Sequence, residues 1–154
     1  IFNELDHRRR KYGWKRPVFD FAASPANALA SHFWTIEDDS LSKSVDEIRD
    51  VLRGLKGPVW LNPPYGGRNG IRPWLQRLAE HGDGIALVPN RTGADWFQDF
   101  AQWADGLLFV RKKIRFLRPD GTEGASPGYG NVLMAFGPKM RGALHGSAVR
   151  GLRV

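Results

Sequence analysis

The sequence of 154 residues predicts an α/β protein of one domain, with a mostly parallel sheet that carries an antiparallel hairpin at its edge. Two features of the apolar pattern support this fold class. Short apolar runs alternate with amphipathic segments as far as residue 105, as in parallel strands joined by helices. Two further apolar runs then follow without a helix between them, which favours an antiparallel pair.

The first elements are a helix, a strand and a second helix. A short helix is expected within residues 1–12, and a strand then runs through 17–25. Ser44 and Glu47 have the spacing of a capping box, in which the two side chains satisfy free amides at a helix start. Apolar residues at helical spacing continue from there, so we expect a helix over 45–55.

The middle of the chain continues the alternation, with buried strands expected at 58–61 and 85–89. Pro73 suits the first turn of the helix between them, and Gly82 suits its end. Thr92 and the acidic residue three positions later form a second possible capping box. The helix that follows has an aromatic face, for which the core is the expected place.

The last elements are strands. The apolar runs 106–110 and 114–117 are either two strands or one bent strand, and 131–136 is the final strand. Between them, residues 118–130 are rich in glycine and proline, which predicts a mobile hairpin loop. We expect a folded domain to end at residue 137, and the basic segment 138–154 to be a flexible tail.

The charge of the chain points to a polyanionic partner. Its net charge is +7 and its pI about 10.1, and the excess lies in two basic clusters at 8–16 and 111–118. Such clusters attract the phosphates of nucleic acids. A solvated basic face is the alternative for either cluster alone.

Composition also excludes several kinds of site. The chain has no cysteine, so it has neither disulfides nor thiolate metal ligands, and its four histidines show no metal-ligand spacing. We therefore expect no metal. The chain has no run of about 18 apolar residues, so no membrane span is predicted. A cytoplasmic protein is the default expectation.

The residues Asn62-Pro63-Pro64-Tyr65 directly follow a short apolar run and carry most of the chemical information. Two prolines stiffen this loop. The amide oxygen of Asn62 and the main-chain oxygen of Pro63 are two acceptors, and Tyr65 adds a flat ring. This set suits a planar ring with an exocyclic amino group, whose nitrogen lone pair can be aimed at an electrophile once both hydrogens are bound.

The motif resembles the catalytic motif of S-adenosylmethionine-dependent amino-methyltransferases, which act on adenine N6, cytosine N4 or glutamine side chains. Two further segments, 18–27 and 87–97, resemble parts of the phage-type DNA N6-adenine methyltransferase family. The first is a strand that ends Phe-Asp-Phe-Ala-Ala, and the second is a strand ending Leu-Val-Pro, followed by Arg-Thr and Trp-Phe. The resemblance implies a Rossmann-like methyltransferase sheet of reduced size, within a methyltransferase domain of residues 1–137.

The implied reaction is methyl transfer from S-adenosylmethionine to N6 of adenine in DNA, without a metal, in the cytoplasm of a prokaryotic or phage-infected cell. The adenine would first be flipped out of the duplex. Two alternatives stay open at this point. One is a methyltransferase that acts on RNA or on a protein glutamine. The other is a non-catalytic nucleic-acid-binding domain with the same fold.

The site residues that we predict fall into three groups. The catalytic group is the motif itself: Asn62, Pro63, Pro64 and Tyr65. The cofactor-binding group lies at strand ends, where ligands bind in open α/β sheets, and comprises Asp20, Ala22, Ala23, Asp38 and Asp39. Within that group the resemblance points to Asp39, with Asp38 as its rival. The nucleic-acid-binding group comprises Arg68, Arg91, Arg111, Lys112 and Lys113.

Overall fold

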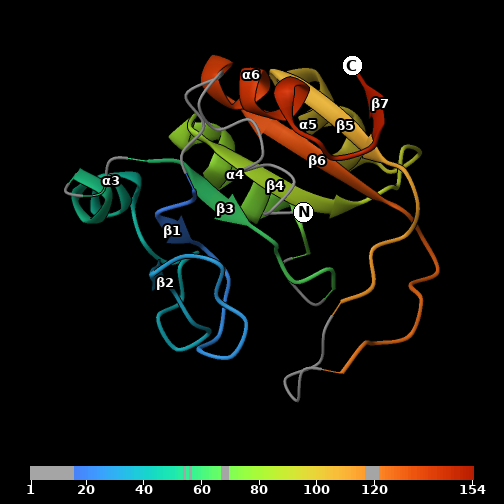
Figure 1. Ribbon diagram of the computed structural model, residues 1–154. Helices are drawn as coiled ribbons and strands as arrows, with labels where there is room; N and C mark the ends of the chain where they lie inside the picture. The colour runs from blue at the N-terminus through green and yellow to red at the C-terminus, as the bar shows by residue number, and fades with distance from the viewer. Residues whose placement is uncertain (1–15, 54, 56, 67–69, 117–121) are drawn as a thin grey trace.

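The computed structural model of the chain (Figure 1) describes residues 16–53, 55, 57–66, 70–116 and 122–154. Within these residues a seven-stranded mixed sheet and four helices confirm the α/β class. The short helix expected within residues 1–12 lies outside the described residues. No helix in the described part of the chain is long and apolar enough to cross a membrane.

The strands are β1 (Phe19–Asp20), β2 (His32–Phe33), β3 (Val59–Leu61), β4 (Gly84–Pro89), β5 (Gly106–Val110), β6 (Asn131–Phe136) and β7 (Gly151–Arg153). They lie side by side in the order β2-β1-β3-β4-β6-β5-β7 (Figure 1). The pairs from β2 to β4 are parallel, whereas β4–β6, β6–β5 and β5–β7 are antiparallel.

This pairing corrects the expected sheet in two respects. The sheet is evenly mixed rather than mostly parallel, with three parallel and three antiparallel pairs, because β7 adds a third antiparallel pair by lying against β5. The β5–β6 hairpin forms as expected but does not lie at the edge, because β7 occupies the outer side of β5. β5 ends at Val110, and the second apolar run, which begins at residue 114, is not a strand where the structure describes it.

The strand directions bring several chain segments to one end of the sheet. The carboxyl ends of β1, β3, β4 and β5 lie at the same end as the amino ends of β6 and β7. We call this end the carboxyl edge. Asp20, Asn62 and Asn90 all lie at or directly after a strand terminus on this edge.

The helices are α3 (Val45–Arg53), α4 (Arg72–His81), α5 (Asp95–Trp103) and α6 (Pro138–Gly146). The capping box of α3 is confirmed, since the Glu47 amide donates to Ser44 Oγ over 3.1 Å and the Ser44 amide donates to the Glu47 carboxylate over 2.7 Å. Gly82 ends α4 in the left-handed conformation, with φ 72°.

The start of α5 differs from the prediction. Ala94 is its N-cap, and no side chain caps the helix, so Thr92 does not form a capping box. The chain turns between Thr92 and α5, and the carbonyl of Thr92 instead accepts a hydrogen bond from Gln98. The aromatic face of this helix is buried only in part: Phe97 and Phe100 belong to the core as expected, whereas Trp103, the last residue of α5, is 63% exposed.

The sheet buries side chains on both faces. Alternate strand residues such as Val59 and Leu61 pack with apolar residues of α3, α4 and α5, whereas Trp60 belongs to a second cluster with α6. Helices therefore cover both faces, which explains why β3, β4 and β6 are buried along their whole length.

The C-terminal segment 138–154, expected to be a flexible tail, forms α6 and β7. Met140, Ala143 and Leu144 are buried against the sheet, and their helical spacing is hidden in the sequence among basic and small residues. The guanidinium of Arg153 donates to the carbonyls of Ser147 and Val149, so part of the basic character of the segment serves to hold its fold.

Candidate active site

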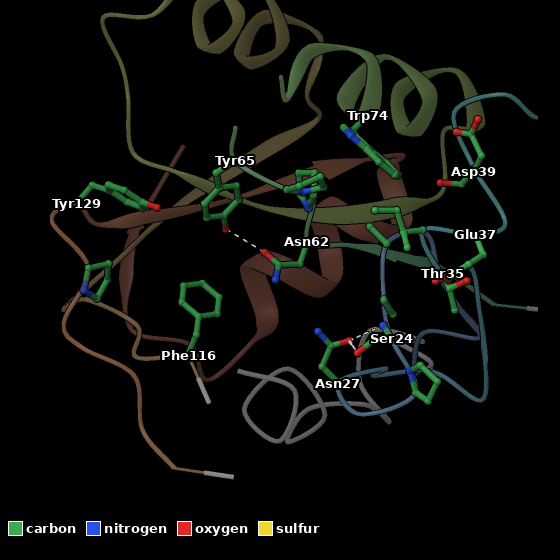
Figure 2. Close-up of a pocket in the computed structure, with 18 residues that line it drawn as sticks. Ser24, Asn27, Thr35, Glu37, Asp39, Asn62, Tyr65, Trp74, Phe116 and Tyr129 are labelled. Carbon is green, nitrogen blue, oxygen red and sulfur yellow. Dashed lines mark hydrogen bonds between the residues drawn. The ribbon is translucent and has the colours of Figure 1, made fainter. Parts of the chain in front are cut away.

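A cavity of about 700 Å³ opens at the carboxyl edge, beside the ends of β1 and β3 (Figure 2). Its walls come from the loop after β1, the loop after β2, the loop after β3, one residue of α4 and the chain between β5 and β6. The lining residues are Ala22, Ala23, Ser24, Pro25, Asn27, Thr35, Ile36, Glu37, Asp39, Ser40, Asn62, Pro63, Pro64, Tyr65, Trp74, Phe116, Pro127 and Tyr129.

The loop after β3 contributes all four of its predicted catalytic residues to the wall. Leu61 is fully buried and fixes the end of β3, and the two prolines that follow Asn62 restrict the backbone. The hydroxyl of Tyr65 lies 2.9 Å from Oδ1 of Asn62 and 3.2 Å from the carbonyl oxygen of Leu87. Burial raises the pKa of this hydroxyl, so it stays protonated and able to donate.

Aromatic rings enclose one half of the cavity. The ring of Tyr65 meets Phe116 edge-on at a centroid distance of 6.4 Å and Tyr129 edge-on at 6.1 Å. The guanidinium of Arg91 lies 5.7 Å from the centroid of the Tyr129 ring. The rings give this half of the cavity an aromatic lining, which suits a planar ligand.

The other half of the cavity carries polar and acidic side chains. Figure 2 shows Thr35, Glu37, Asp39 and Trp74 on the side away from Tyr129, with Asn62 between the two halves. Glu37 is exposed and contributes a carboxylate to this half. Asp39 has a left-handed backbone, with φ 44°.

The structure separates the two rival aspartates. Asp38 does not line the cavity, because its carboxylate accepts hydrogen bonds from the Thr35 amide over 2.8 Å and the Thr35 hydroxyl over 3.0 Å. These bonds lower the pKa of Asp38 and hold the loop. Asp39 lines the cavity, as does Glu37, which the sequence analysis left out.

Asp20 lies behind the cavity wall rather than in it. It is 2% exposed, and its carboxylate accepts hydrogen bonds from the amides of Ala22 over 3.3 Å and Leu29 over 3.2 Å. Burial raises the pKa of Asp20, and the two amides oppose that shift. These hydrogen bonds hold the loop after β1, whose residues Ala22 and Ala23 line the cavity.

The predicted nucleic-acid-binding residues do not gather in one place. Arg91 is exposed next to the aromatic half of the cavity. Arg111, Lys112 and Lys113 lie on the chain that leaves β5 and line a separate, smaller cavity. Arg68 lies outside the described residues.

Several lining residues were not predicted from the sequence. They include Ser24, Asn27, Thr35, Glu37, Trp74, Phe116 and Tyr129. One signal was present, since Phe116 and Tyr129 are aromatic residues at the two ends of a loop rich in glycine and proline. In the described part of the chain, no group of three or more His, Cys, Asp or Glu side chains is placed to hold a metal ion.

Comparison with known proteins gives one match. The model of a family described as DNA N-6-adenine-methyltransferase (Dam) matches residues 1–142 of the 154. Comparisons with curated proteins and with solved structures find no match.

Proposed function

Because the chain belongs to the DNA N-6-adenine-methyltransferase (Dam) family, we propose that it transfers a methyl group from S-adenosylmethionine to N6 of adenine in DNA. The observation that carries this proposal is the position of the loop Asn62–Tyr65. It stands on the wall of one cavity, with aromatic rings on one side and acidic side chains on the other.

The aromatic half is the proposed place of the adenine. Tyr65 and Phe116 offer ring faces and edges to a flat base, and stacking on aromatic side chains contributes about 1–3 kcal/mol per base. The base would reach this half only after leaving the duplex, at a cost of a few kcal/mol that stacking and hydrogen bonds offset.

The polar half is the proposed place of the methyl donor. The carboxylates of Glu37 and Asp39 suit the hydroxyl and ammonium donors of S-adenosylmethionine, and Trp74 offers an apolar surface to its adenine ring. A volume of about 700 Å³ lies within the range of roughly 300–1,000 Å³ that is usual for small-molecule sites. The residues present therefore fit this ligand.

Asn62 lies where the two halves meet, and this decides its proposed role. Its Oδ1 accepts a hydrogen bond from Tyr65 and has a second lone pair for an amino hydrogen of adenine. The main-chain oxygen of Pro63 would accept the other amino hydrogen. With both hydrogens held, the lone pair of N6 is directed towards the polar half.

The bound donor supplies an electrophilic methyl group on a sulfonium. The lone pair of N6 would form the new N–C bond, the electrons of the C–S bond would stay on sulfur, and one N6 proton would pass to solvent. The oxygens of Asn62 and Pro63 would stabilise the positive charge that develops on N6. This chemistry requires neither a metal nor a covalent enzyme intermediate.

Replacement of Asn62 by Ala tests the proposal. The variant should lose methyl transfer to DNA and keep its fold, its affinity for DNA and its affinity for S-adenosylmethionine. Leu29→Ala, at a half-exposed apolar residue that does not line the cavity, serves as a control.

The acceptor assay should compare duplex DNA, RNA and a glutamine-containing protein fraction with the same labelled donor. Transfer to DNA alone supports the proposal. A flat calorimetric titration with S-adenosylmethionine, or undiminished transfer by Asn62→Ala, would overturn it. A titration without heat of binding would instead support a nucleic-acid-binding domain that no longer binds the methyl donor.

A further inference from the structure

Four exposed cationic side chains gather at the carboxyl edge, away from the cavity described above. Arg111, Lys112 and Lys113 follow β5, and Arg150 precedes β7. Together with apolar residues they line a separate cavity of about 270 Å³. We call these four residues the β5–β7 basic cluster.

Backbone contacts hold the cluster together. β5 and β7 pair antiparallel with Val110 opposite Gly151, and the amide of Arg111 donates to the carbonyl of Arg150 over 2.8 Å. Lys112 has a left-handed backbone, with φ 73°, which is uncommon for a residue other than glycine. The fold thus brings four like charges together at some electrostatic cost.

The charges of the cluster are not neutralised within the described part of the chain. The salt bridges there involve other cations, among them Arg115, which pairs with Glu123 at 3.0 Å. None of them includes Arg111, Lys112, Lys113 or Arg150. Four adjacent unpaired cations around a small concave surface are suited to a phosphate group.

We propose that the β5–β7 basic cluster binds the phosphodiester backbone of the DNA whose adenine enters the cavity. This inference rests on the proposed function and adds a second contact site to it, with Arg150 as a member that the sequence analysis did not identify. The cluster and the loop after β3 lie on the same edge of one sheet, so a single duplex can lie across both (Figure 1).

The separation of the two sites fits a duplex. Between β3 and β5 the sheet order gives three strand intervals, and between β3 and β7 four. At about 4.8 Å per interval this is about 14–19 Å. Since phosphates of one strand advance about 3.4 Å per base pair along the axis, the contacted phosphates lie about four to six base pairs from the target adenine.

The test is the salt dependence of DNA binding. A triple variant, Arg111→Gln, Lys113→Gln and Arg150→Gln, removes three charges of the cluster and leaves its strained residue, Lys112, in place. A matched variant, Arg49→Gln, Lys139→Gln and Arg141→Gln, removes three charges from exposed helix positions in α3 and α6. Circular dichroism on heating checks that both variants fold.

Fluorescence anisotropy with a labelled duplex of 20 base pairs gives the slope of log affinity against log salt concentration. Each lost phosphate contact should reduce this slope by about 0.9, which corresponds to about eightfold in affinity at 0.1 M relative to 1 M salt. We expect the cluster variant to lose one to two such contacts and the matched variant to lose none.

Equal slopes for the cluster variant and the matched variant would overturn the inference, as would a lack of DNA binding by the unmodified protein. Neither result depends on methyl transfer. If the cluster variant shows the reduced slope but the unmodified protein transfers no methyl group, the proposed function fails while the DNA contact stands. If the unmodified protein transfers a methyl group but the two variants have equal slopes, the proposed function stands and the proposed DNA contact of the cluster fails.

Discussion

The hydroxyl of Tyr65 donates to Oδ1 of Asn62 over 2.9 Å, within a loop that two prolines stiffen. This contact joins the ring that forms one wall of the cavity to the amide that lies between its two halves. It therefore fixes the orientation of the Asn62 side chain before any ligand enters. The two residues should act as a unit, and their substitutions should not be additive.

Two substitutions at Tyr65 separate its ring from its hydroxyl. Tyr65→Phe keeps the ring and loses one hydrogen bond, so kcat/KM should fall by about 2- to 12-fold, which corresponds to about 0.5–1.5 kcal/mol. Tyr65→Ala also loses base stacking of about 1–3 kcal/mol, so a further fall of about 5- to 150-fold is expected. Steady-state methyl transfer measures both. Equal losses in the two variants would contradict a stacking role for the ring.

The acidic residues after β2 should differ in their effect on the methyl donor. Glu37→Gln and Asp39→Asn remove charged acceptors from the cavity wall, and each should weaken binding of S-adenosylmethionine by about 10- to 150-fold, or about 1.5–3 kcal/mol. Asparagine tolerates the left-handed backbone at position 39, so the second change does not add strain.

Asp38→Asn is the matched control, because it removes a charge from the same loop but not from the cavity wall. Asparagine can still accept the hydrogen bond from the Thr35 amide, so the loop should persist and affinity should change little. Isothermal titration calorimetry measures the affinity of the three variants for S-adenosylmethionine. A larger loss in Asp38→Asn than in the other two would show that the donor does not contact Glu37 or Asp39.

Asp20 should make the stability of the fold depend on pH. Because burial raises its pKa in the folded protein above the ordinary value of about 3.9, the folded state holds this proton more tightly than the unfolded state. The contribution of Asp20 to stability is therefore fully present below about pH 4 and is lost as the pH rises through the raised pKa.

Urea unfolding of the unmodified protein and of Asp20→Asn between pH 4 and 7 measures this effect. Since asparagine does not titrate, the variant should gain stability relative to the unmodified protein as the pH rises. The variant also places an amide group where the carboxylate accepted the Ala22 and Leu29 amides, so a constant loss is expected at all pH values. A relative stability that falls with rising pH would mean that the amides outweigh burial.

Local chemistry explains what could be predicted from the sequence. The capping box of Ser44 and Glu47 and the left-handed end of α4 at Gly82 depend on residues within one helical turn, and both formed as expected. The loop Asn62–Tyr65 was also identifiable, because its prolines and the strand before it are adjacent in the chain. Its placement on a cavity wall agrees with the predicted role.

Features that depend on distant segments could not be predicted. Phe116 and Tyr129 meet Tyr65 only because β6 enters the sheet between β4 and β5, which no local pattern specifies. Which acidic residues line the cavity depends on which carboxylate accepts the hydrogen bond from the Thr35 amide. Asp38 accepts it and is held away from the cavity, whereas Glu37 and Asp39 line the wall. The C-terminal segment was predicted to be a flexible tail because basic and small residues separate its few apolar ones, and the helical spacing that begins at Met140 becomes evident only where the segment packs on the sheet.

The most direct test of the central claim identifies the methylated product. The protein is incubated with duplex DNA and S-adenosylmethionine that carries a deuterated methyl group, and the DNA is then digested to nucleosides for mass spectrometry. We predict labelled N6-methyldeoxyadenosine with the unmodified protein and none with Asn62→Ala. Label on cytosine, no label in DNA at all, or equal label with both proteins would contradict the account.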